Sequence, residues 1–204
     1  MRNSTKYDKI LDALQSLLEH KTLQNISVSE IAQTAGIGKG SIYYYFPSKD
    51  AILDALVKRN YESPIQTAKT LSRQTDISSF TRMAMIFQAC RNSSSAFRYH
   101  PSGTLETDAK GESFLHHKYI KHLISELKPE LTEIIRQGIE NGDIHFDQPA
   151  ALAEIALIVL TVKLDNTLVP SSEEEIEDTI RGLISLLGKG METPPGSLNF
   201  LTVF

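Results

Sequence analysis

Apolar residues recur every three or four positions along almost the whole chain, and this periodicity constrains the fold more than any other feature. The sequence contains no run of four to eight alternating β-branched residues bounded by turns, which is the pattern of a strand. Pro64 is expected to kink or break one helix, and Pro129 to separate helices at 111–127 and 129–142. We therefore expect an all-α protein of about nine helices.

Composition excludes several classes of protein. Hydrophobic residues make up 41% of the chain and charged residues 23%, close to the average for globular domains, so the chain is not disordered as a whole. The longest aliphatic run, Ile155–Leu160, is far shorter than the roughly 20 residues that a membrane span requires. No apolar segment follows the polar first eight residues, as a secretory signal would need. We expect a soluble, cytoplasmic protein without a membrane partner.

Charge is distributed unevenly. The net charge of −4 argues against a nucleic-acid binder, but residues 1–60 hold eight Lys and Arg against six Asp and Glu. The acidic excess lies in residues 61–204. Within the basic region, Arg2, Lys6 and Lys9 either contact a DNA backbone or belong to a solvated terminus.

The segment 27–46 has the small residues that a helix-turn-helix requires. Ala32 lets two short helices cross closely, and Gly36 can adopt the positive φ of the turn. A shared apolar wedge is expected from Ile31, Ala35, Ile37, Ile42 and Tyr45. The outward positions of the second helix offer donors, a small residue and phenol hydroxyls that suit a major groove: Lys39, Gly40, Ser41, Tyr43 and Tyr44. An ordinary helical hairpin would pack in the same way, so the prediction of DNA binding depends on this outward face.

Residues 5–60 resemble the tetracycline-repressor (TetR) family of bacterial transcription regulators, through the run GIGKGSIYYYFPSKDAIL at 36–53. The resemblance implies a three-helix DNA-binding head, a linking fourth helix, and a larger helical body that dimerises and encloses a small-molecule pocket. It gives domains at 1–48 for the head and 49–190 for the effector-binding and dimerisation body. Residues 191–204 form a tail that either frays or docks through its apolar tip.

The family pattern also implies which side chains touch DNA. Base edges or nearby phosphates would be met by Lys39, Gly40, Ser41 and Tyr43. The DNA backbone would be held by Tyr44, Ser48 and Lys49, with Val28 and Ser29 at the edge of the surface. The family often has a hydroxyl-bearing phosphate contact where this chain has Val28. Either Ser27 or Ser29 replaces that contact, or the contact is absent.

Two further sites are expected in the body. Where the family builds its effector pocket, this chain has Phe87, Phe97, Tyr99, Phe114, His117 and Tyr119, although aromatic residues at such spacing are also common in a plain core. The dimer interface is expected to use two apolar stripes, on helices 148–168 and 172–187: Ile155, Ile158, Val159 and Val162, and Ile176, Ile180, Leu183 and Leu187. Burial of both helices within one chain is the alternative.

Other chemistry finds little support. His116, His117 and His122 are one, five and six residues apart, so they do not share a helix face as metal ligands would. Cys90, the single cysteine, reads as structural. No catalytic set can be assembled, and we expect no cofactor, no metal and no enzymatic activity.

The leading hypothesis is a homodimeric regulator, most simply a repressor, that releases a palindromic operator in double-stranded DNA when an unidentified small molecule binds its body. A constitutive DNA-binding dimer is the second hypothesis, and a helical enzyme or carrier is the third.

Overall fold

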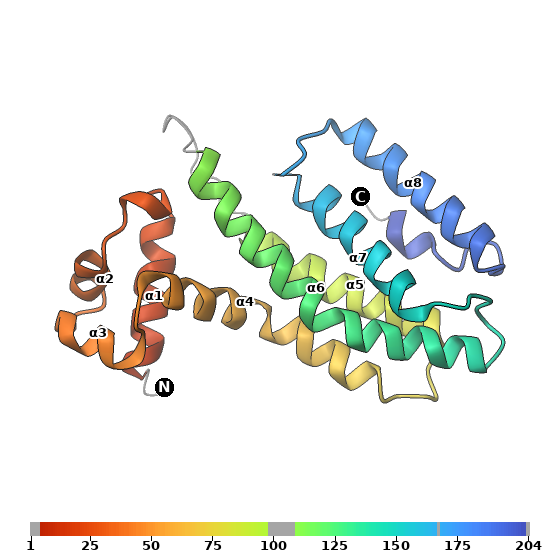
Figure 1. Ribbon diagram of the computed structural model, residues 1–204, viewed down its shortest axis with the longest axis horizontal. Coiled ribbons are helices and arrows are strands. Elements are labelled where there is room, and N and C mark those ends of the chain that lie inside the picture. The colour runs from red at the N-terminus through yellow and green to blue at the C-terminus, as the bar shows by residue number, and fades with distance from the viewer. Residues whose placement is uncertain (1–4, 98–108, 167, 203–204) are drawn as a thin grey trace. The chain divides into compact units, whose positions relative to one another are not determined.

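The computed structural model describes residues 5–97, 109–166 and 168–202, and it describes side chains except at 93–116 (Figure 1). Within these ranges the chain is all-α, with eight α-helices and two short 3₁₀ helices: α1 (Lys6–Leu18), η1 (Leu23–Asn25), α2 (Val28–Thr34), α3 (Lys39–Tyr45), α4 (Lys49–Leu71), α5 (Ser79–Phe97), α6 (Ala109–Glu140), α7 (Pro149–Asp165), α8 (Glu173–Gly190) and η2 (Asn199–Thr202). The predicted fold class is confirmed. None of the described helices has an apolar stretch long enough to cross a membrane.

Two prolines lie inside helices that continue past them. Pro64 lies in α4, and Pro129 lies in α6, which joins the two helices expected at 111–127 and 129–142. Each proline lacks an N–H, so the carbonyls of Asn60 and Ser125 lose their helical donors. Packing compensates for this loss in α6, where Leu127 and Ile134 are buried on either side of the proline. This continuity explains why there are eight described α-helices and not nine.

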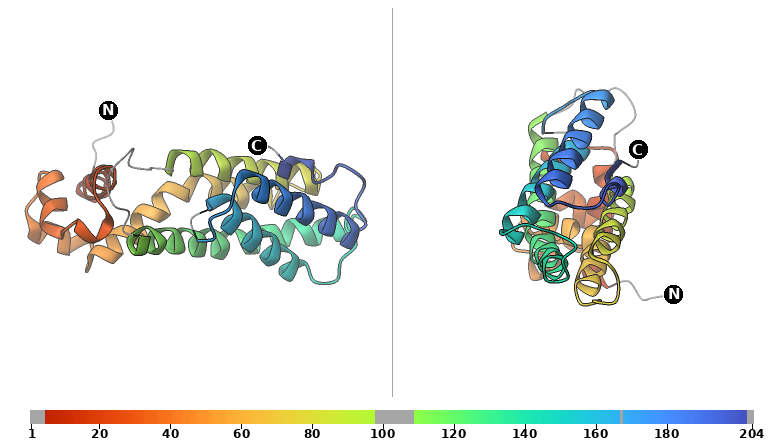
Figure 2. Two further views of the ribbon diagram at one scale, coloured as in Figure 1. Left: turned by 90° about the horizontal axis from the view of Figure 1, so that it is seen from above. Right: turned by 90° about the vertical axis from the view of Figure 1, so that its right-hand side faces the viewer.

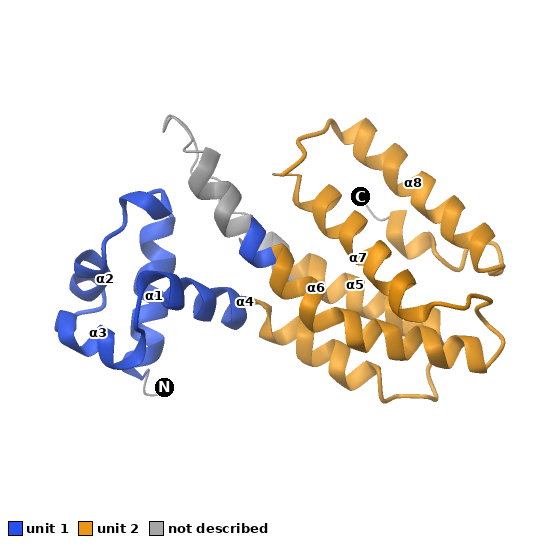
Figure 3. Cartoon of the chain, viewed as in Figure 1, with its two compact units in different colours: residues 1–60, 96–119 blue, residues 61–95, 120–204 orange. Residues whose placement is uncertain are grey.

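The chain forms two compact units (Figure 3). Unit 1 comprises residues 1–60 and 96–119, and unit 2 comprises residues 61–95 and 120–204. Both α4 and α6 contribute to each unit. The predicted boundary after residue 48 stays a prediction, but the core of unit 1 includes Ile52, Leu53 and Leu56 from the first turns of α4.

Unit 1 has a small core built from residues close in sequence. Ile10, Leu11 and Leu14 of α1 meet Ile31 of α2 and Ile42 of α3, all fully buried. Reciprocal capping boxes begin both α1 and α2, with Thr5 and Asp8 at the first and Ser27 and Glu30 at the second. These local signals define where each short helix begins.

Unit 2 joins α7, α8 and the C-terminal segment around a second core. Helix α8 packs against both α7 and η2, and Figure 2 shows the segment after α8 turning back along that helix. Met191, Leu198 and Leu201 are buried in this core, and the ring of Phe200 meets Phe87 of α5 with centroids 6.1 Å apart. Of the two alternatives for the tail, the described part through residue 202 docks on the body of its own chain.

A buried arginine ties three segments of unit 2 together. The guanidinium of Arg82 on α5 is fully buried and donates to the carbonyl oxygen of Leu71, to Oε1 of Gln137 and to Oγ of Ser79. Gln137 in turn donates to the carbonyl oxygen of Ser72. Burial lowers the pKa of Arg82, because a desolvated cation is disfavoured. The ends of α4, α5 and α6 therefore meet at one polar cluster inside the body.

Candidate DNA-binding surface

The turn between α2 and α3 has the geometry of a helix-turn-helix. Ala32 is buried at the approach of the two helices, and Gly36 has a φ of +66°, a conformation that side-chain-bearing residues rarely adopt. The amide of Ile37 donates to the carbonyl oxygen of Ala32 at 3.0 Å, which closes the end of α2. Ile31 and Ile42 are fully buried between the helices, as predicted.

Helix α3 places a polar and aromatic face in solvent. Lys39 and Gly40 are exposed, Ser41 is half-buried, and Tyr43 and Tyr44 are 51% and 83% exposed. A Cβ added at Gly40 would meet no atom within 4 Å, so the helix backbone is open to a close approach there. This face combines a cation, hydroxyl donors and aromatic surface, which suits base edges and phosphates.

Tyr45 does not belong to the wedge, which corrects one prediction. Its ring is 38% exposed and contacts Tyr44 edge-on at 5.0 Å. Phe46 takes the buried place and packs against Tyr7 of α1, with ring centroids 4.9 Å apart. The helix turns by about 100° per residue, so the wedge position after Ile42 falls at Phe46, one full turn later.

The start of α2 distinguishes the serines on either side of Val28. Val28 is half-buried against the head core, and Ser27 caps the helix, its Oγ accepting from the amide of Glu30 at 3.2 Å. Ser29 is exposed. Glu30 also binds Lys21 at 2.7 Å, and that hydrogen bond, with those from Ser27, lowers the pKa of Glu30 to about 2. Both serines are exposed, and of the two hydroxyls that of Ser27 is engaged in the helix cap.

The start of α4 gives Lys49 a structural task. Ser48 accepts from the amide of Ala51 at 3.1 Å and caps the helix. The ammonium of Lys49 is half-buried and donates to the carbonyl oxygens of Leu23 and Ile26, both at 2.8 Å. Two of its three donors therefore bind the connection between α1 and α2. Its predicted phosphate contact stays a prediction and depends on the third donor.

Three other lysines of the head are available to phosphates. Lys6, Lys9 and Lys39 are exposed and make no ion pair with any residue in the described ranges. Arg59 of this unit is engaged with Asp12 at 2.7 Å. The positive potential of the predicted surface therefore comes from α1 and from the start of α3.

The predicted effector residues are only partly described. The side chains of Phe97, Tyr99 and Phe114 lie outside the described residues. Phe87 is half-buried in unit 2 against Phe200, whereas in unit 1 Tyr119 is buried and His117 exposed. The effector pocket therefore remains a prediction.

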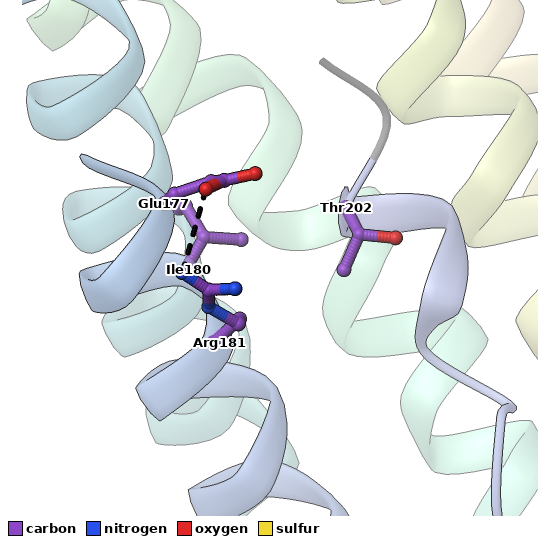
Figure 4. A pocket seen from close by; sticks show the side chains of 4 residues that line it. All are labelled: Glu177, Ile180, Arg181 and Thr202. Carbon is purple, nitrogen blue, oxygen red and sulfur yellow. Dashed lines mark hydrogen bonds and ion pairs between the residues drawn. The ribbon is translucent and has the colours of Figure 1, made fainter. Parts of the chain in front are cut away.

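A shallow hollow lies between α8 and the C-terminal segment (Figure 4). Its empty volume is about 330 Å³, part of which is open solvent. The residues that line it are Glu177, Ile180, Arg181 and Thr202. Glu177 and Arg181 form an ion pair at 3.4 Å across one turn of α8. None of the six predicted effector residues lines this hollow, and it offers a ligand little enclosure.

The two predicted dimer stripes differ in their exposure. On α7, Ile155 and Ile158 are 48% and 46% exposed, while Val159 and Val162 are half-buried. On α8, three positions of the predicted stripe are buried in the core of the single chain and a fourth is half-buried, and their place in an interface stays a prediction: Ile180, Leu183 and Leu187, and Ile176. The large apolar side chain that α8 exposes is Leu186, at 67%. A stripe at i, i+3 and i+7 marks a buried face whether the partner is the same chain or a second copy, so the sequence could not separate the two.

The remaining reactive side chains show no assembled site. Cys90 lies on α5, and burial raises the pKa of its thiol to about 12, so the thiolate is scarce at neutral pH. Among the residues with described side chains, no three His, Cys, Asp or Glu gather as metal ligands would.

Sequence reasoning missed two contacts of unit 1. The ring of Tyr7 on α1 packs against both Tyr45 and Phe46 at the end of α3. Lys118 binds Asp50 and Asp54 of α4, 64 or more residues earlier in the chain. Aromatic residues at the start of α1 could have indicated the first contact. No local signal indicated the second, because it joins segments that are distant in sequence.

The head has close relatives in sequence. The family model of the bacterial regulatory proteins of the tetR family matches residues 10–56. The HTH-type transcriptional regulator EthR of Mycobacterium tuberculosis is 40% identical over 63 residues, which are 31% of this chain and 29% of EthR. The chain thus spans less than a third of the length of the curated relatives that it matches.

Solved structures resemble the whole chain in fold. SmeT, the repressor of the Stenotrophomonas maltophilia multidrug efflux pump SmeDEF, has a TM-score of 0.65 at 14% identity, covering 96% of this chain and 93% of SmeT. RolR in complex with resorcinol has a TM-score of 0.60 at 16% identity, covering 97% of this chain and 93% of RolR. The helix-turn-helix geometry and the match over residues 10–56 lead to one identification: this chain carries the helix-turn-helix head of the tetR family of bacterial regulatory proteins, and solved structures share its fold.

Proposed function

We propose that this protein acts as a homodimeric repressor that binds a palindromic operator through α3 and releases it when a small molecule binds the body. The observation that carries the proposal is the exposed face of α3, where Lys39, Gly40, Tyr43 and Tyr44 stand on a fully packed helix-turn-helix. Ser41 and Ser29 flank this face with hydroxyl groups. Lys6 and Lys9 of α1 add charge that phosphates attract.

Operator binding is tested by selecting bound sequences from random duplex DNA at physiological salt. We expect a palindrome whose half-sites lie about one helical turn apart, as the two-fold symmetry of a dimer requires. Lys39→Ala should change the preferred bases, whereas Lys9→Ala should weaken all sequences alike and reduce the salt slope by about one. A selection without enrichment, together with no salt-dependent binding, would contradict the proposal.

The dimer is supported by apolar surface on two adjacent helices of the body. Ile155 and Ile158 on α7 and Leu186 on α8 expose large aliphatic side chains that a single chain leaves in water. Gly182, one turn before Leu186, would meet no atom within 4 Å with a Cβ added, so a partner helix can approach closely there. We assign the interface on α8 to this face, in place of the stripe through Leu183.

The interface is tested by sedimentation of charge-insertion variants. Leu186→Glu should give monomers and lose affinity for the palindrome, because both half-sites must be held at once. Ser185→Glu is the matched control, since it adds the same charge to α8 at an exposed position about 100° away around the helix. An intact Leu186→Glu dimer would show that the interface lies elsewhere.

Effector control is supported by the fold shared with RolR, which was solved with resorcinol bound. A ligand acts by favouring the conformation of the body in which the heads no longer match their half-sites. A thermal-shift panel of small phenols and other drug-sized compounds tests this step, followed by operator release with any compound that stabilises the protein. If no compound stabilises the protein or releases DNA, the constitutive dimer is the better description.

A further inference from the structure

The ammonium of Lys118 joins two carboxylates on the first turns of α4. Its Nζ lies 3.0 Å from Asp50 and 2.7 Å from Oδ1 of Asp54. All three residues belong to unit 1, although Lys118 is on α6. The two aspartates are 55% and 59% exposed, whereas the Lys118 side chain is only 16% exposed. The cation is therefore held between the helices and does not extend into solvent.

The two aspartates need a cation between them. They lie four residues apart on one helix face, where like charges repel each other. Asp50 is stabilised by the positive end of the α4 dipole, but Asp54 lies beyond the first turn. Burial lowers the pKa of Lys118, but hydrogen bonds to Asp54 and Asp50 outweigh that effect and raise it. The bridge thus relieves a repulsion on α4 and compensates the desolvation of Lys118.

The same turn of α4 also holds the connection that leads into α2. Lys49, the residue before Asp50, donates to the carbonyl oxygens of Leu23 and Ile26. Ile26 directly precedes Ser27, which caps α2. Consecutive residues of α4 therefore fix two partners, with Lys49 bound to the start of the helix-turn-helix and Asp50 bound to α6. One turn of α4 therefore connects Lys118 to the segment that leads into α2.

We propose that Lys118 is a positioning residue for DNA binding, which holds the start of α4, and through it the helix-turn-helix, to residues 109–119 of α6. This inference rests on the proposed operator binding. Lys118 does not touch DNA in this role. It keeps the head in the orientation that binds, so less order has to be imposed when the complex forms.

The first test measures affinity for the selected palindrome as a function of salt. Lys118→Met should bind about tenfold more weakly, in the range of coupling between residues of one ion-pair network, with an unchanged slope against salt. A lysine that touched phosphate would instead reduce the slope by about one when removed. Lys118→Arg should restore most of the affinity, because its guanidinium can bind both carboxylates. Lys121→Met is the matched control, an exposed lysine one turn along α6 without an ion pair in the described ranges.

The second test removes the other side of the bridge. Asp50→Asn with Asp54→Asn should weaken DNA binding about as much as Lys118→Met, and the triple variant should lose no more than either. If the aspartates only repelled phosphates, their removal would strengthen binding, and this result would overturn the proposal. Both aspartates are more than half exposed, and Met fills the volume of the Lys118 stem, so these variants should fold, as circular dichroism would verify.

The outcomes separate the two levels of inference. A wild-type protein without salt-dependent DNA binding would overturn the proposed function and the positioning role together. Wild-type binding with an unaffected Lys118→Met variant, or with a reduced salt slope in that variant, would overturn only the positioning role.

Discussion

The head and the body of this protein use different means to define their structure. In the head, α1 and α2 begin at capping boxes, the turn has its glycine, and a small core joins residues within about 50 positions. In the body, long helices continue past prolines, and a buried arginine joins segments up to 66 positions apart. The relatives reflect this difference, since EthR is 40% identical over the head while SmeT shares the whole fold at 14%. The structure and function of a region can be predicted from its sequence where local signals and an exposed functional face define it. They cannot be predicted in the same way where long-range packing defines the region.

The largest expected effects come from the two cores. Ile31→Ala in the head should cost about 3 kcal/mol, because it leaves a cavity at a fully buried position. Leu183→Ala should destabilise the body in the same way, because Leu183 lies in its core. We expect the head variant to lose operator binding while most of the helical signal in circular dichroism persists to high temperature. Simultaneous loss of both units in a single melting transition would contradict the separation of the cores.

The polar cluster of the body should respond to what replaces its arginine. Arg82→Ala leaves the carbonyl of Leu71 and the amide oxygen of Gln137 without their donor, at about 1–3 kcal/mol for each buried group. Arg82→Met should be milder, because it fills the volume and removes a desolvated charge. Urea unfolding would measure both. Equal losses in the two variants would mean that volume and charge matter less here than the lost hydrogen bonds.

Substitutions at two glycines would distinguish the cost of backbone strain from the cost of side-chain crowding. Gly36→Ala in the head meets no atom within 4 Å but must keep a φ of +66°, at about 1–2 kcal/mol. Gly138→Ala in the body has no such φ, but its Cβ would lie 2.8 Å from Cδ1 of Ile144 and 2.9 Å from Oγ of Ser79. We expect overpacking to cost about 1–3 kcal/mol there. Adding Ile144→Val, which removes Cδ1, should partly rescue Gly138→Ala, and Gly36→Asn should be milder than Gly36→Ala, as thermal melts would show.

The smallest effects are in pH dependence, with opposite signs in the two regions. Glu30 in the head has a pKa lowered to about 2, so its contribution to stability is present above pH 4.5 and is lost as the pH falls toward 2. Cys90 in the body has a pKa raised to about 12, so its contribution is present below pH 9 and is lost as the pH rises toward 12. Glu30→Gln should flatten the acid side of the stability profile and Cys90→Ala the alkaline side. The Cys90 thiol should also resist iodoacetamide at pH 8 until the protein unfolds.

Most of the head was predictable from its sequence. The glycine turn and the outward side chains of α3 follow from spacing and chemistry, and the structure places them accordingly. Tyr45 was misplaced because three consecutive tyrosines fit either face of a helix, and only Phe46 fills the core. Lys49 was predicted only as a phosphate contact. Its hydrogen bonds to Leu23 and Ile26 were missed because they join residues that are distant in sequence.

The body was predictable in class but not in detail. Its helices are apolar enough to recognise, yet the sequence could not say which stripe faces its own core. Leu186 lies one position from the buried Leu187, and on a helix that difference is about 100° of rotation. Pro129 was read as the end of a helix because the usual cost of an interior proline is local, whereas the packing that offsets it is not.

The proline of α4 has a consequence for how such proteins can be recombined. The head core ends at Leu56, and Tyr61 is the first buried residue of unit 2. Asn60 lies between these two residues, and Pro64 leaves its carbonyl without a helical donor. A helix with a missing hydrogen bond bends there at little cost. A crossover between Asn60 and Tyr61 would keep the head core through Leu56 with one parent and Tyr61 with the other. Residue 118 would then come from the parent of the body, so a chimaera needs a lysine there to keep the ion pairs with Asp50 and Asp54.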